Sequence, residues 1–154
     1  MNKSILILFI FFFVTQCGFS PLHSNRTNVN FSINELKFDG DKTIINYMKT
    51  NLNQFRNDEY AKKFNVDINT NYQKNILSKD GTGKVSNYEI INYTTFKISL
   101  NGKFIKELKV SEKKNMTDMN DKFEEQKYER TIKQNFASSM SDKLITELSI
   151  INDN

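Results

Sequence analysis

Residues 88–110, YEIINYTTFKISLNGKFIKELKV, carry the strongest β-hairpin signal in the chain. Apolar and aromatic residues recur at every second position before and after Asn101-Gly102, a dipeptide that favours tight turns between paired strands. The stretch therefore predicts two long antiparallel strands joined at this turn.

The length of the hairpin loop determines which side chains pair across the two strands. A two-residue loop would place Phe96 opposite a charged residue. A three-residue loop, residues 101–103, would instead place Phe96 opposite Leu108 and Leu100 opposite Phe104. Because only this register pairs apolar side chains with each other, we predict the longer loop.

Two further stretches show the pattern of half-buried strands. Residues 29–38 alternate apolar and polar side chains with one change of phase before Leu36, which indicates a bulge. Residues 64–77 continue the alternation as far as a glycine-containing turn at residues 78–84. The chain therefore contains four predicted strands, one of them well before the other three.

Two stretches have the spacing of helices. Residues 44–55 place their apolar side chains within about 100° of one another on a helix of 3.6 residues per turn, and Asp41 is the predicted N-cap. Residues 121–151 predict one long helix, capped by Asp118 or Asn120. The order is thus strand, helix, three strands, long helix.

The apolar stripe of the long helix is wider than one flat sheet requires. Most of its positions are four residues apart, so between Tyr128 and Leu148 the stripe turns through about 200°. Either the helix wraps a twisted sheet, or part of the stripe is held for another protein. In the second interpretation the partner-facing candidates are Phe123, Tyr128 and Leu148.

The first residues of the chain have the features of a secretory signal peptide. One lysine, Lys3, precedes an uninterrupted apolar run at residues 5–14, and Thr15-Gln16-Cys17-Gly18 follows. Ten apolar residues make only about 15 Å of helix, half the hydrocarbon thickness of a bilayer. We therefore predict a cleaved signal peptide over residues 1–16 rather than a spanning helix.

Composition excludes several kinds of site. The chain has one cysteine and one histidine, so a Cys/His zinc site is excluded, and a Cys17–His23 pair would lie in a polar segment without periodicity. No glycine-rich phosphate loop and no catalytic constellation is visible, and we predict neither an enzyme nor a metal or other cofactor. A formal charge of +4 with scattered lysines does not indicate nucleic acid as a partner.

Val14-Thr15-Gln16-Cys17 resembles a bacterial lipobox, although Gln16 stands where Gly, Ala or Ser is usual. The resemblance implies cleavage before Cys17 and acyl chains on this residue, with residues 17–28 as a tether. Two or three chains hold a protein on a bilayer far more firmly than one, at about 0.8 kcal/mol per buried CH₂. The alternative is an ordinary signal peptide that is cut elsewhere and leaves Cys17 as an incidental thiol.

The order of elements, together with the Cys-Gly-Phe-Ser-Pro-Leu start at residues 17–22, resembles the LPS-assembly outer-membrane lipoprotein (LptE) family. The run into the last helix, residues 115–130, is also similar to that family. The resemblance implies a single α+β domain over residues 29–154, a four-stranded sheet packed against two helices in the order β-α-β-β-β-α. It also implies a lipid-anchored protein on the periplasmic side of the outer membrane.

The function that this resemblance implies is non-enzymatic. Members of the family form a complex with a large LptD-like β-barrel and assist lipopolysaccharide transport and barrel assembly. Candidate contacts to lipopolysaccharide phosphates are lysines beside the two predicted hairpin turns. These are Lys79, Lys84, Lys103 and Lys106, which could equally be solubilising residues at loop tips.

Two other functions stay open at this point. A free periplasm-facing lipoprotein could bind a lipid or protein ligand in a helix–sheet groove lined by Phe96, Phe104 or Phe136. A small hydrolase would need converging acidic, serine or lysine side chains, and their spacing shows none.

Overall fold

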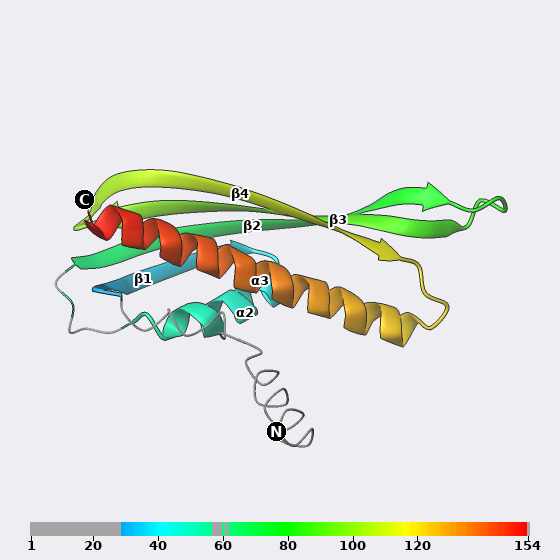
Figure 1. Cartoon of the computed structure of the whole chain (residues 1–154), viewed down its shortest axis with the longest axis horizontal. Coiled ribbons are helices and arrows are strands. Elements are labelled where there is room, and N and C mark those ends of the chain that lie inside the picture. Colours follow the sequence, from blue (N-terminus) through cyan, green and yellow to red (C-terminus); the bar gives the residue numbers. More distant parts are fainter. Residues whose placement is uncertain (1–28, 57–59, 61, 154) are drawn as a thin grey trace, which may run out of the picture.

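The computed structural model describes residues 29–56, 60 and 62–153. Its elements are β1 (Phe31–Gly40), α2 (Lys42–Asn53), β2 (Lys62–Lys79), β3 (Val85–Leu100), β4 (Lys103–Thr117) and α3 (Lys122–Asp153). The strands form one sheet in the order β1-β2-β3-β4, with β1 parallel to β2 and the other pairs antiparallel. Both helices lie on one side of this sheet (Figure 1). The predicted fold class and element order are confirmed, whereas the signal peptide and tether, residues 1–28, lie outside the described residues.

The first strand and helix form as their sequence predicts. The register between β1 and β2 shifts between Ile33 and Glu35, which is the predicted bulge. The Asp41 carboxylate accepts hydrogen bonds from the backbone N–H groups of Thr43 and Ile44, both at 3.0 Å. Asp41 is therefore the N-cap of α2, and it satisfies donors that have no partner within the helix.

The β3–β4 hairpin corrects the predicted loop. The turn contains two residues, since Leu100 pairs with Lys103 rather than with Phe104, and Asn101 has a positive φ of 52°. Phe96 nevertheless pairs with Leu108 as predicted, because the register shifts next to Ser99 and leaves one extra residue in β4. A bulge therefore restores the apolar register that a two-residue turn alone would lose.

The N-cap of α3 also differs from the prediction. The Asp121 carboxylate accepts hydrogen bonds from the N–H groups of Phe123 at 2.8 Å and Glu124 at 3.3 Å. Asp118 instead forms ion pairs with Lys122 and Lys84. Several acidic and amide side chains precede this helix, and only the path of the chain selects the one that caps it.

The core lies between the sheet and the two helices and has two apolar clusters. The larger cluster joins β1, β2, β3, α2 and the second half of α3, while the smaller one contains Ile90, Met116, Ile132 and Phe136. α3 packs on α2 as well as on the sheet, so these two neighbours together cover most of the apolar stripe that turns around the helix.

Candidate interaction surfaces

The first half of α3 is held to the sheet by partly buried ion pairs. The Lys74 ammonium group in β2 lies 3.0 Å from the Glu125 carboxylate and 2.9 Å from that of Glu129. The Tyr72 hydroxyl donates a hydrogen bond of 2.7 Å to Glu129. Lys133, one turn further along α3, pairs with the cap residue Asp41 at 2.9 Å. These contacts connect α3 to both β2 and the start of α2.

The charged state of this cluster is stable around neutral pH. Hydrogen bonds from Lys122 and from Lys74 lower the pKa of Glu125 to about 2, against the opposing effect of burial. Burial would lower the pKa of Lys74, but hydrogen bonds from its ammonium group to Glu129 and Glu125 raise it above the ordinary value. Burial and the Glu129 carboxylate raise the pKa of Tyr72. Each of these three shifts moves the pKa away from 7, so Glu125, Lys74 and Tyr72 are not tuned to exchange a proton near pH 7 as a general acid or base would be.

The hairpin between β2 and β3 projects past the helices (Figure 1). β1 pairs with β2 only as far as Thr70, so the rest of β2 lies beyond the parallel pair. Ile76 and Leu77 on this ribbon are exposed. At its tip the Asp80 carboxylate accepts hydrogen bonds from the N–H groups of Thr82 at 2.8 Å and Lys84 at 3.0 Å. The tip therefore has a defined loop conformation and an apolar flank.

The structure separates the four predicted lysines into two groups. Lys79 and Lys84 flank the projecting tip, where Lys84 also lies 3.8 Å from Asp118. Lys103 and Lys106 lie at the β3–β4 hairpin, at the opposite end of β3, and Lys106 forms an ion pair with Glu147 at 2.7 Å. The four side chains cannot converge on one phosphate.

The three predicted partner-facing residues of α3 have different environments. Phe123 is 73% exposed and Tyr128 is 38% exposed, so both are available to a partner. Leu148 is 0% exposed and belongs to the larger core cluster, so its assignment to a partner-facing surface is corrected. At this position the first of the two interpretations of the stripe holds, in which the helix packs on the chain's own core.

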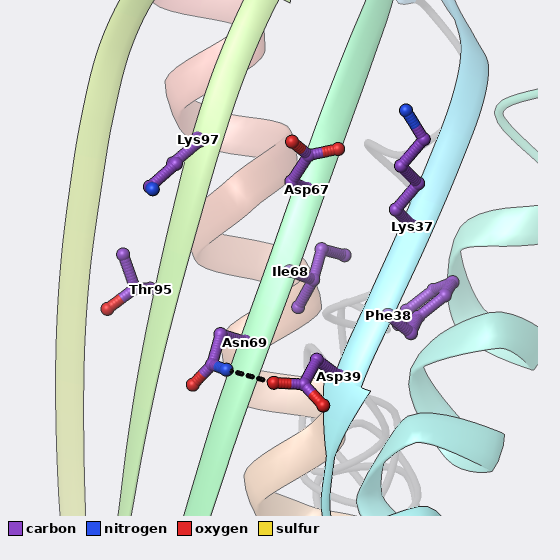
Figure 2. A pocket seen from close by; sticks show the side chains of 8 residues that line it. All are labelled: Lys37, Phe38, Asp39, Asp67, Ile68, Asn69, Thr95 and Lys97. Atoms are coloured by element: carbon purple, nitrogen blue, oxygen red, sulfur yellow. Dashed lines mark hydrogen bonds between the residues drawn. The ribbon is translucent and has the colours of Figure 1, made fainter.

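The other face of the sheet carries a row of alternating charge that the sequence analysis missed. Lys37, Asp67, Lys97 and Glu107 are register partners across β1, β2, β3 and β4. Figure 2 shows the first three beside a hollow of about 200 Å³, with the Asn69 amide donating a 2.6 Å hydrogen bond to Asp39. The four charged residues occupy alternate positions of separate strands, and their alignment can be recognised only when the strand register is known.

The predicted groove between helix and sheet does not bring its three phenylalanines together. Phe96 and Phe136 are buried in different core clusters, whereas Phe104 is exposed at the β3–β4 hairpin. A hollow of about 590 Å³ does lie between β1 and α2. Its lining mixes apolar and polar side chains: Leu36, Phe38, Lys49, Thr50, Asn53 and Arg56.

The residues that the structure describes contain no group of three or more His, Cys, Asp or Glu side chains that could hold a metal ion. Among these same residues, no helix has both the length and the apolar composition needed to cross a membrane.

These features define a class by fold: a four-stranded sheet with two helices on one face and a projecting hairpin. The chain is similar in structure to rare lipoprotein B from Shewanella oneidensis, with a TM-score of 0.60 at 17% identity, over 79% of this chain and 98% of that one. It is also similar to lipoprotein B from Nitrosomonas europaea, with a TM-score of 0.58 at 11% identity, over 83% and 90% of the two chains.

A third similar structure is a minor lipoprotein from Acinetobacter baumannii, with a TM-score of 0.52 at 12% identity, over 73% of this chain and 93% of that one. No family model and no curated protein matches the sequence. At these identities the likeness establishes the fold and leaves function to be argued from this chain's own residues.

Proposed function

We propose that this chain is a non-enzymatic lipoprotein, anchored through acyl chains on Cys17 to the periplasmic side of the outer membrane. It forms a complex with a large LptD-like β-barrel and assists lipopolysaccharide transport and assembly of that barrel. The fold shared with bacterial lipoproteins and the lipobox-like residues 14–17 support the anchor.

The observation that carries the complex with a barrel is apolar surface left uncovered at one end of the domain. Ile76 and Leu77 on the projecting ribbon and Phe123 at the start of α3 are all exposed. Lys84 at the ribbon tip lies 3.3 Å from the amide oxygen of Asn120, so the ribbon tip and the chain entering α3 are neighbours. Exposed apolar side chains gathered at one end of a domain are typical of a contact with another molecule, and we take this molecule to be the barrel protein.

The first experiment is purification of the chain from bacterial outer membranes through a carboxyl-terminal tag. We expect a β-barrel protein much larger than 18.1 kDa to co-purify in a fixed ratio. Phe123→Ser should reduce the amount of barrel at least fivefold, because it removes the most exposed aromatic ring of this end. The matched control is Tyr93→Ser, an exposed ring on the other face of the sheet, which should leave the ratio unchanged.

Isolation of the chain without any barrel protein would contradict the proposed complex. The anchor is tested separately by mass spectrometry of the mature amino-terminal peptide. An unmodified Cys17, or a mature chain that starts at another residue, would contradict the lipid anchor.

Contact with lipopolysaccharide is assigned to the ribbon tip. Lys79 and Lys84 can offer point charges to phosphate groups there, although neither supplies the two-pronged geometry of arginine. Lys79→Glu with Lys84→Glu should weaken binding of purified lipopolysaccharide to the chain, whereas Lys109→Glu on the exposed part of β4 should not. Equal binding by both variants would contradict this assignment.

A further inference from the structure

The end of the sheet opposite the ribbon tip gathers both termini of the described domain. β1 begins there, because Phe31 pairs with Lys62 at the start of β2. β3 ends there, because Phe64 pairs with Leu100. The Lys62 ammonium group donates a hydrogen bond to the backbone oxygen of Asn152, which brings the end of α3 to the same place. We call this the anchor end, since Cys17 precedes β1 in the sequence.

Three large apolar side chains are exposed at the anchor end. Phe104 is 58%, Ile105 41% and Ile150 53% exposed. Two of these side chains lie at the start of β4, the edge strand, where residues 103–107 are all exposed. The register shifts here, because Ser99 pairs with Phe104 and Ile98 with Lys106, which leaves Ile105 as the extra residue of a bulge.

Lysines surround this apolar end. Lys103 precedes Phe104 and is exposed, and Lys106 follows Ile105. The ion pair between Lys106 and Glu147 places the last turns of α3, and with them Ile150, beside the start of β4. Apolar side chains flanked by lysines are the pattern of proteins that rest on the interface of an anionic bilayer.

The length of the tether determines which end of the molecule can reach the anchored bilayer. Eleven residues lie between Cys17 and Val29, so these twelve chain steps span at most about 40 Å when fully extended. β2 alone, with 18 residues, is about 55 Å long at 3.3 Å per step. With β2 upright on the bilayer and the ribbon tip down, the tether would have to cover about the 55 Å of β2, which is more than its full extension. The anchor end lies where β1 begins, so it can rest on the bilayer with a short tether.

We infer that the anchor end is a second membrane contact, in which Phe104, Ile105 and Ile150 enter the interface of an anionic phospholipid bilayer and neighbouring lysines bind its headgroups. This inference rests on the proposed membrane anchor but does not depend on the barrel. It places the anchor end on the bilayer and leaves the ribbon end free for the proposed contacts with the barrel protein and lipopolysaccharide.

The test uses the full chain in phosphatidylethanolamine–phosphatidylglycerol vesicles without any barrel protein. An environment-sensitive fluorophore is attached at Ile105→Cys, or at Thr82→Cys on the ribbon tip as the matched control. If mass spectrometry finds Cys17 unmodified, both labels are placed in the Cys17→Ser chain. In the acylated chain the lipid holds the protein on the vesicle, whereas in the Cys17→Ser chain only the proposed contact can do so. The two positions are compared with each other in the same chain.

We expect the label at position 105 to emit at shorter wavelength and to be quenched by lipids that carry spin labels on their acyl chains. The label at position 82 should show neither effect. Neutral phosphatidylcholine vesicles should weaken the response at position 105. Equal signals at the two positions would overturn the inference, and an undiminished response in neutral vesicles would overturn its electrostatic part.

These outcomes are distinct from those of the barrel experiment. A membrane response at position 105 in a chain that co-purifies with no barrel would support the contact and contradict the export function. A barrel complex with equal signals at positions 105 and 82 would support the export function and contradict the membrane contact.

Discussion

The ammonium group of Lys74 lies between the carboxylates of Glu125 and Glu129, at 3.0 and 2.9 Å, in a partly buried position under α3. It also lies 4.3 Å from the centre of the Tyr88 ring. One lysine of β2 therefore neutralises two acidic residues of the helix and packs against an aromatic ring of the neighbouring strand. Lys74 is a structural residue that fixes where the long helix begins to rest on the sheet.

Lys74→Met should lower the free energy of unfolding by about 1–3 kcal/mol, because it leaves two carboxylates with one fewer partner away from water. Urea denaturation at pH 7 measures this loss. The control is Lys109→Met, which breaks the exposed Lys109–Glu107 pair and should leave the free energy of unfolding nearly unchanged. Equal effects of the two substitutions would contradict the structural role of Lys74.

The same cluster predicts a pH dependence of stability. The pKa of Glu125 is lowered from 4.5 to about 2 in the folded chain, so the unfolded chain takes up this proton first as the pH falls. The stability contributed by the charged carboxylate is complete above the unfolded pKa and is lost as the pH falls from about 4.5 through about 2.

Urea titrations of the natural chain and Glu125→Gln from pH 7 down to pH 2 measure this contribution. The difference between their free energies of unfolding should stay constant above the ordinary glutamate pKa and shrink steadily below it. A difference that does not change with pH would show that the Glu125 charge contributes nothing.

Gly40 is required by a close approach between two strands. Its φ is 115°, and a Cβ atom at this position would lie 1.8 Å from the backbone oxygen of Thr70. Gly40→Ala should therefore destabilise the fold by about 2 kcal/mol or more, because backbone must move to relieve the clash.

Thermal unfolding followed by circular dichroism measures this effect. Gly81→Ala is the matched control, since a Cβ there would meet no atom within 4 Å, and its melting temperature should stay close to that of the natural chain. A Gly40→Ala variant as stable as the control would contradict the observed chain path.

Substitutions at Leu148 and Phe123 should distinguish the buried face of α3 from its exposed surface. Leu148→Ala should cost about 2–5 kcal/mol, because it leaves a cavity in a well-packed cluster. Phe123→Ala should change stability by less than about 0.5 kcal/mol, because the ring is mostly in water. Urea denaturation of both variants under one set of conditions is the measurement, and a large loss for Phe123→Ala would place this ring in the fold rather than on a binding surface.

Local sequence patterns are enough to predict the class of fold and the order of its elements. Alternation of period two and spacing of period 3.6 depend on neighbouring residues, so residues 88–110 and 121–151 identify their own secondary structure. The N-cap at Asp41 and the bulge before Leu36 are equally local, and the structure confirms both.

Only the tertiary structure decided which of these residues are available to another molecule. Leu148 and Phe123 have similar places in the sequence pattern, yet one is buried because the end of α3 packs on the core while the helix start extends beyond it. The charge row from Lys37 to Glu107 and the separation of Lys84 from Lys106 likewise depend on strand register and direction. Periodicity records which residues avoid water, but exposure and proximity arise from contacts between segments that are distant in the chain.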